Sequence, residues 1–272
     1  MRREEELRRR LRTLTALRRA MVAMKSVAAL HFRAARRSVA EARDYREGIE
    51  RMLGAADETP PMRGPAGLLV VGAELGLCGG YGAQIVEAAI ARREALGDGP
   101  TLCAGRRAAA ALARRGIPPD RSFPAPTSVD GITGALLPIA EEVLLRFVSD
   151  RLGSFYVVSS RFAGVGRARP ECVRLLPLSA QRAEVGPGVR YVSAEAFTFA
   201  AIRERLYIAL YDVLLDAIAS EHGARLVATQ AAETWLEDRA GAVRRRLAAA
   251  RREATTQEVI EIAGGARARA GR

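Results

Sequence analysis

About fifty residues near the start of the chain have the hydrophobic pattern of one long helix. The segment from 4 to 53 contains no proline and a single glycine. Its less polar positions alternate spacings of three and four residues, as a left-handed coiled coil requires, at Leu14, Leu17, Met21, Met24, Ala28, His31 and Ala35. At 1.5 Å per residue this helix is a rod of roughly 75 Å, so we expect it to need a partner along its length.

A second segment, from 195 to 262, has the same character. Only Gly223 and Gly241 interrupt its helical pattern, and it would form a rod of roughly 100 Å. Its apolar positions again recur at three or four, at Ile202, Leu206, Leu210, Val213, Ala217, Ala224, Val227 and Ala231. We expect the two helices to pair as an antiparallel coiled coil in which the second overhangs the first by on the order of 20–30 Å.

The segment between the two helices has short apolar runs separated by helical stretches. The apolar runs are 68–71, 101–104 and 155–158, and the helical stretches are 83–96, 106–115 and about 133–152. Apolar runs without polar alternation are typical of strands buried on both faces of a parallel sheet. The order predicts a doubly wound, Rossmann-like α/β domain with surface loops at 118–134 and 163–170.

These patterns divide the chain into four parts. Proline ends the first helix, because it has no backbone N–H to donate and disfavours helical geometry in the residue before it. The segment Asp57-Glu58-Thr59-Pro60-Pro61 is therefore typical of a linker. We expect an N-terminal coiled-coil helix over 1–57 and a central α/β domain over 66–191. A C-terminal coiled-coil helix over 193–264 and a basic tail over 265–272 follow. The predicted fold class is α/β with a long antiparallel coiled coil of the terminal helices.

The reactive residue types exclude several kinds of active site. Lys25 is the only lysine, and the Gly-Lys-Ser/Thr triplet of a P-loop does not occur. His31 and His222 are the only histidines and lie far apart, and the three cysteines have no C-x-x-C spacing. We expect no catalytic, cofactor-binding or metal site. No run is long and apolar enough for a membrane span, and we expect a soluble, unexported chain.

Charge changes this picture, because 43 Lys and Arg residues against 31 Asp and Glu give a net charge of +12. Arginines cluster at 8–10, 244–246 and 251–252. Each cluster either attracts an acidic surface or is a solvated helix face. A coiled-coil protein that binds nucleic acid is one alternative function, although its basic helices lack interleaved aromatic residues.

A glycine-rich loop in the middle segment has two interpretations. The loop Gly76-Leu77-Cys78-Gly79-Gly80-Tyr81-Gly82 follows a predicted strand and precedes a predicted helix, where a nucleotide phosphate could bind. A small-molecule enzyme built on this domain is therefore a second alternative. The spacing does not match G-x-G-x-x-G, and a tight turn with positive φ is the competing interpretation.

Three further residues have structural rather than chemical interpretations. His31 lies on the seam of the first helix and is expected to be a packed or interface residue. Trp235, the only tryptophan, is expected to anchor packing or an interface. In Ser220-Glu221-His222-Gly223 we expect a local cap or a helix distortion at Gly223.

Four short strings together resemble the gamma subunit of F-type rotary ATP synthases. They are Ala23-Met24-Lys25-Ser26-Val27-Ala28-Ala29, Gly76-Leu77-Cys78-Gly79-Gly80, Ser220-Glu221-His222-Gly223-Ala224-Arg225 and Thr256-Gln257-Glu258-Val259-Ile260-Glu261-Ile262. Each string alone is weakly specific. Their order and their spacing over nearly the whole chain carry the resemblance, together with the arrangement of helix, α/β domain and helix.

The resemblance implies a central-stalk rotor subunit without a catalytic site of its own. In this family the coiled coil lies inside a ring of three alpha and three beta subunits, and the α/β domain lies beside an epsilon subunit and a membrane c-ring. Rotation driven by ions at the c-ring is coupled there to ATP synthesis or hydrolysis at the beta subunits. A peripheral location at the cytoplasmic face of a bacterial membrane, with no nucleic-acid partner, is the matching expectation.

The resemblance also assigns candidate residues. Contacts between rotor and stator are expected at Met24, Lys25, Arg244, Arg245, Arg246, Arg251, Arg252, Thr256, Gln257 and Glu258. The loop that carries the family motif is Gly76, Leu77, Cys78, Gly79 and Gly80.

The chain departs from the family pattern at three places. The family often has Lys-Ala-Met at Val22-Ala23-Met24 and Arg-Gln at Arg251-Arg252. Its Glu-Pro before the last helix is missing around Tyr191-Val192-Ser193. These departures indicate a divergent or alternative F-type operon.

Overall fold

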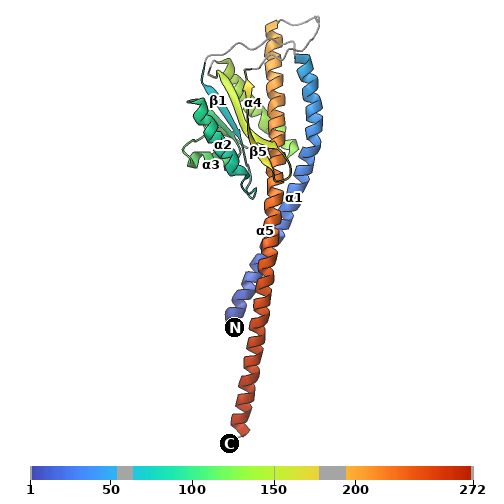
Figure 1. Ribbon diagram of the computed structural model, residues 1–272, viewed down its shortest axis with the longest axis vertical. Coiled ribbons are helices and arrows are strands. Elements are labelled where there is room, and N and C mark those ends of the chain that lie inside the picture. The colour runs from blue at the N-terminus through green and yellow to red at the C-terminus, as the bar shows by residue number, and fades with distance from the viewer. Residues whose placement is uncertain (1, 54–63, 150, 178–193, 271–272) are drawn as a thin grey trace. The chain divides into compact units, whose positions relative to one another are not determined.

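The computed structural model describes residues 2–53, 64–149, 151–177 and 194–270 (Figure 1). The chain forms two compact units. One, the helix pair, consists of the residues up to Ser26 and those from Thr229 onward, and the other, the sheet unit, is Val27–Ala228. Two long helices, α1 (Arg2–Leu53) and α5 (Ala194–Ala270), contribute residues to both units.

The helix pair is an antiparallel coiled coil. Arg251 near the end of α5 bonds Glu4 near the start of α1, whereas Lys25 bonds Glu233. Buried and half-buried positions alternate spacings of four and three, at Leu7, Leu11, Leu14, Arg18, Met21 and Lys25 in α1 and at Thr229, Glu233, Leu236, Ala240, Val243 and Leu247 in α5. The predicted coiled coil is therefore confirmed.

The predicted seam is wrong at two positions of this unit, Leu17 of α1 and Ala231 of α5, which are both exposed. Leu17 is 48% exposed, and Arg18 takes the half-buried position beside it. Arg18 can do so because a long side chain buries its stem while its guanidinium stays near solvent. That guanidinium lies 3.5 Å from the Glu237 carboxylate and 3.9 Å from that of Glu233. A pattern of apolar residues alone does not reveal such a position.

The sheet unit contains a five-stranded sheet with the order β3-β2-β1-β4-β5. Neighbouring strands are parallel except for β4 and β5, which are antiparallel. The strands are β1 (Ala66–Val71), β2 (Thr101–Ala104), β3 (Arg121–Phe123), β4 (Ser154–Phe162) and β5 (Ala168–Leu176). The helices of this unit besides α1 and α5 are α2 (Tyr81–Leu96), α3 (Arg106–Arg114), the 3-10 turn η1 (Val129–Gly131) and α4 (Ile132–Val148).

Helices cover both faces of the sheet, which confirms the doubly wound prediction (Figure 1). Leu68 and Val70 of β1 pack in one core with residues of α2 and α3. Leu69 and Val71 pack in the other core with residues of α4, α1 and α5. Successive side chains of a strand point to opposite faces, so both sets must be apolar here.

Two predicted loops contain strands. The range 118–134 holds β3 and η1, and β5 begins inside the range 163–170. Both strands lie at the edges of the sheet, where one side of the backbone has no neighbouring strand within the described residues. Most of their side chains are exposed or half-buried, so neither strand has the apolar run used to identify the others.

Gly223 does not cap a helix, because α5 is continuous there. A Cβ at this position would lie 3.5 Å from the Phe32 ring and 3.6 Å from the Gly166 backbone nitrogen. A Cβ there would therefore make ordinary van der Waals contacts with α1 and with the loop after β4. The predicted linker 57–61 and the departure at 191–193 lie outside the described residues, and α5 continues to Ala270 within the predicted tail.

Candidate functional site

The family-motif loop 76–80 lies at the carboxyl end of β1 and precedes α2. Leu77 and Gly79 have φ angles of 61° and 56°, and the N–H of Tyr81 donates to the Cys78 carbonyl at 3.2 Å. The loop is therefore the tight turn with positive φ that one of the two interpretations predicted.

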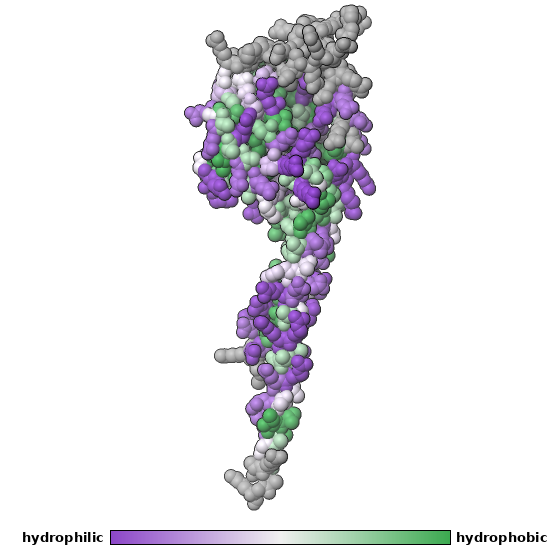
Figure 2. Space-filling model, in the orientation of Figure 1, coloured by the Kyte–Doolittle hydropathy of each residue, from purple (hydrophilic) through white to green (hydrophobic). Residues whose placement is uncertain are grey.

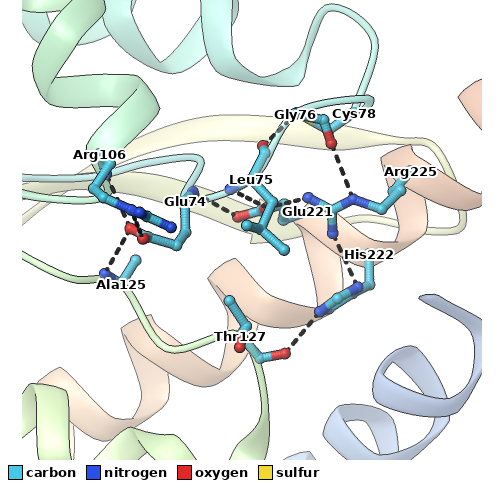
Figure 3. A network of polar contacts seen from close by, with 10 residues as sticks. All are labelled: Glu74, Leu75, Gly76, Cys78, Arg106, Ala125, Thr127, Glu221, His222 and Arg225. Carbon is cyan, nitrogen blue, oxygen red and sulfur yellow. Dashed lines mark hydrogen bonds and ion pairs between the residues drawn. The ribbon is translucent and has the colours of Figure 1, made fainter. Parts of the chain in front are cut away.

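Glu221 of α5 reaches this turn with its carboxylate (Figure 3). It accepts hydrogen bonds from the N–H groups of Glu74 at 3.2 Å and Leu75 at 3.3 Å, and it is ion-paired with Arg225 one helical turn later. The Nε of Arg225 donates to the Gly76 carbonyl at 3.1 Å. Glu221 and Arg225 are only 7% and 3% exposed. Together they fasten α5 to the backbone at the end of β1.

Glu74 is the centre of a second group of buried hydrogen bonds. Its carboxylate accepts from the N–H of Arg106, the first residue of α3, at 2.9 Å, and from the N–H of Ala125 at 3.1 Å. The Arg106 guanidinium also pairs with it. Burial raises the pKa of Glu74, but these hydrogen bonds and the Arg106 charge outweigh burial, so the pKa lies below its usual value. Glu74 therefore stays ionised at the N-terminus of α3, where a negative charge is favourable.

His222 completes the network on the side of α1. Its Nε2–H donates to the Thr127 carbonyl at 2.9 Å, and its Nδ1 accepts from the Arg225 guanidinium at 3.0 Å. Burial lowers the pKa of His222 to about 4. The hydrogen bond to Thr127 raises this pKa, whereas the charge of Arg225 lowers it. The His31 ring of α1 lies 5.1 Å away, centroid to centroid. His222 is therefore a neutral, packed histidine.

This network occupies backbone N–H groups near the loop. The groups at the end of β1 and at the start of α3 could otherwise bind a phosphate, whereas the predicted phosphate position is at the start of α2. Carboxylates of Glu221 and Glu74 already accept from them. Burial also raises the pKa of the Cys78 thiol and that of Cys103, the latter to about 12, so neither is an activated nucleophile.

The described residues add two further observations. Among them, no group of three His, Cys, Asp or Glu side chains is placed to hold a metal ion. No helix in the described ranges is both long and apolar enough to cross a membrane.

Of the two predicted contact residues of α1, Lys25 bonds the partner helix. The Nζ of Lys25 lies 2.5 Å from a Glu233 carboxylate oxygen and 3.0 Å from the Gln230 amide oxygen, and Met24 is half-buried. Lys25 therefore holds the two helices together.

The predicted contact residues of α5 are on its exposed surface. Arg244, Arg245 and Arg246 are exposed, as are all residues from 251 to 258. Arg251 bonds Glu4 at 2.9 Å. The hydroxyl of Thr256 donates to the Arg252 carbonyl, Gln257 bonds Glu261, and Glu258 is exposed.

The structure does not bring the two predicted contact groups together. Because the helices are antiparallel, Lys25 is level with 230–233, about 30 Å along α5 from Arg251.

The helix pair has a basic aromatic hollow that the sequence analysis did not predict. Its volume is about 210 Å³, and it is lined by Arg10, Leu14, Trp235, Arg239, Ala242, Val243 and Arg246. The Arg239 guanidinium lies 5.3 Å from the centre of the Trp235 ring, which is 55% exposed. The signal was available, because Trp235, Arg239 and Arg246 share one helix face at spacings of four and seven.

The last described turns of α5 expose an apolar surface. Val259, Ile260 and Ile262 are 60%, 59% and 72% exposed. Hydrophobic residues gather on this C-terminal part of α5 in Figure 2. Large apolar side chains are thus solvent-exposed near the end of the described helix.

Comparison with known proteins gives one family throughout. The model of the family described as ATP synthase matches residues 3–268. The ATP synthase gamma chain of Moorella thermoacetica is 30% identical, and the match covers 96% of this chain and 97% of the relative. The ATP synthase gamma chain of Rubrobacter xylanophilus is 28% identical, with 97% of each chain covered.

Solved structures show the same fold. A chain in the structure of Euglena gracilis mitochondrial ATP synthase, containing OSCP, F1 and the c-ring, superposes with a TM-score of 0.67 at 15% identity. That match covers 97% of this chain and 94% of the other. A chain in the central stalk and c-ring structure of Tetrahymena thermophila mitochondrial ATP synthase gives a TM-score of 0.59 at 19% identity, covering 78% and 99%.

Proposed function

Because the chain belongs to the ATP synthase gamma family, we propose that it is the central-stalk rotor subunit of such a complex. Its rotation couples ion movement at a membrane c-ring to ATP synthesis or hydrolysis at catalytic beta subunits. The observation that carries this proposal is the antiparallel helix pair, whose outer surface is rich in charge while its own seam is narrow and partly polar.

The mechanism follows from the asymmetry of this pair. Three identical beta subunits around one shaft would meet different faces of it at any moment. A shaft that binds one beta conformation better than another shifts that subunit toward this conformation, and turning the shaft moves the preference to the next subunit. For this role the shaft must be stiff and must present different side chains on its different faces, and it needs no catalytic group.

Contacts with the beta subunits are proposed on the exposed arginines of α5. Arg244, Arg245, Arg246 and Arg252 are exposed and carry charge that would attract acidic loops. Arg251 and Lys25 already bond acidic residues of the helix pair, so acidic loops would have to compete for them. The apolar surface of Val259, Ile260 and Ile262 would be covered inside the ring.

The proposed assembly contains three alpha and three beta subunits around one copy of this chain, with an epsilon subunit and the c-ring. It would lie peripherally at the cytoplasmic face of a bacterial membrane. We propose no catalytic site in this chain.

The test is co-purification of the full chain with alpha and beta subunits of its own organism, followed by ATP hydrolysis with and without it. We expect a complex with three alpha, three beta and one copy of this chain, whose hydrolysis depends on it, and no turnover by the chain alone. Failure to assemble, or hydrolysis that is the same without the chain, would overturn the proposal.

A further inference from the structure

We propose that a groove of the sheet unit binds a basic segment of a partner protein, which inserts an arginine or lysine side chain between tyrosine rings. The groove has a volume of about 440 Å³ and lies between α1, α4 and α5. Three tyrosines and three carboxylates line it, namely Tyr45, Tyr207, Tyr211, Glu41, Glu204 and Asp212. The proposal does not depend on the stalk function.

The charge of the groove is opposite to that of the chain. Among the described residues that line it, none is an arginine or a lysine, although the chain has 43 of them. Arg46 pairs with Asp212 at 2.6 Å and Arg203 with Glu204 at 3.5 Å, so part of this charge is balanced from outside the lining. Glu41 adds a third, exposed carboxylate on α1.

The electrostatic effect is visible at one tyrosine. Burial raises the pKa of Tyr211, and the charges of Glu41 and Asp212 raise it further. The carboxylates of Glu41 and Asp212 therefore lie close enough to act on the aromatic wall of the groove. The face of a tyrosine ring also attracts cations, and guanidinium groups stack on such rings.

Exposed apolar residues lie on the same side of α4 as the groove lining, with the exposed Glu141 between them. Leu137 lines the groove and is 40% exposed, while Leu145 and Val148 are 69% and 61% exposed. Positions 137, 145 and 148 lie on one side of a helix, because 3.6 residues make a turn. This surface extends beyond what a small cation would cover, and it favours a protein segment with apolar residues beside its basic one.

Fluorescence anisotropy on the full chain tests the proposal. The probe is a labelled peptide with one arginine flanked on each side by two leucines, and its control is the same peptide with citrulline, which has the shape of arginine without its charge. We expect citrulline to weaken binding about tenfold. Glu41→Gln and Tyr45→Leu should each weaken binding of the arginine peptide about threefold to tenfold. Both side chains are exposed, so the fold should tolerate these changes.

The matched control variant is Glu87→Gln, which removes an exposed carboxylate from α2 on the other face of the sheet and should leave affinity unchanged. Equal binding of the two peptides, no binding of either, or equal effects of Glu41→Gln and Glu87→Gln would overturn the proposal. Sedimentation of the chain alone is the second measurement. A dimer that Leu137→Asp abolishes would also overturn it, because a second copy would then cover the groove.

Discussion

The helix pair and the sheet unit use charged residues of the same helix in opposite ways. In the sheet unit, Glu221 and Arg225 of α5 are buried and bond fixed partners in the loop after β1. In the helix pair, Arg244, Arg245 and Arg246 of α5 are exposed. The difference shows where α5 is fastened to its own chain and where its surface is available to others.

The two arrangements differ in energetic consequence. Exposed ion pairs contribute about 0–1 kcal/mol to stability, so they can be exchanged for contacts with a partner. Breaking a buried pair from one side costs about 3–5 kcal/mol, since a charge stays behind in a poorly solvated place. A shaft that transmits torque needs buried ion pairs where it joins its base, and exposed ion pairs where it slides past other subunits.

The largest expected effect is that of Glu221→Gln. The variant keeps the shape of the side chain but removes the negative charge beside the buried Arg225 guanidinium. We expect the free energy of unfolding to fall by about 3–5 kcal/mol, measured by urea denaturation of the full chain. Glu237→Gln, which removes a 58% exposed carboxylate near Arg18, is the control and should cost less than about 1 kcal/mol. Equal losses in the two variants would erase the contrast between the units.

Packing of α1 gives the next effect. Ala28 is fully buried in the sheet unit, so Ala28→Gln must place a longer polar side chain in a closed space. We expect a loss of about 1–3 kcal/mol by the same denaturation experiment. Ala20→Gln on the exposed face of α1 in the helix pair should change stability by less than about 0.5 kcal/mol. An Ala28→Gln variant as stable as the original chain would show that α1 is not packed there.

The third prediction concerns pH. His222 has a pKa of about 4 in the folded chain and about 6.5 when unfolded, so between these values the unfolded state binds more protons. Its contribution to stability is complete above pH 6.5 and is lost as the pH falls toward 4. We expect stability to drop by about 2 kcal/mol from pH 7 to pH 5.

Urea denaturation at several pH values measures this drop. His222→Gln should remove most of it, whereas His31→Gln should leave most of it in place, because the charge of His31 is the weakest of the causes that lower the pKa of His222. A drop of the same size in His222→Gln would place its origin elsewhere.

The smallest effect is expected in the helix pair. Lys25→Met removes the bond to Glu233 from a half-buried position, and we expect a loss of about 1 kcal/mol. Arg244→Met, at an exposed position, should stay within about 0.5 kcal/mol of the original chain. A larger loss for Arg244→Met than for Lys25→Met would contradict the assignment of Lys25 to the helix contact and of Arg244 to the free surface.

The sequence predicted the elements whose apolar pattern is strong. The long helices and the buried strands β1, β2 and β4 follow from uninterrupted helical patterns and from apolar runs. The edge strands β3 and β5 were not predicted, because most of their side chains are exposed or half-buried and they therefore lack an apolar run. The half-buried position of Arg18 was not predicted, because a charged residue does not appear in a pattern of apolar positions.

The polar network was only half visible in the sequence. Glu221 and Arg225 lie one helical turn apart, which is a signal for a pair on α5. Nothing local shows that this pair bonds the backbone of Glu74 and Gly76, 147 and 149 residues earlier, because that contact depends on the packing of α5 on the sheet. The same holds for Arg10 and Trp235, which only the antiparallel register brings to one hollow.

The most direct test of the central claim is rotation of the chain in an assembled complex. Cys172 is exposed while Cys78 and Cys103 are buried, so a bead can be attached at Cys172 of the chain held by three immobilised alpha and three beta subunits. We predict that ATP turns the bead stepwise in one direction, with rotation and hydrolysis lost together when the chain is left out. Sustained ATP hydrolysis with a stationary, firmly attached bead would contradict the rotor function.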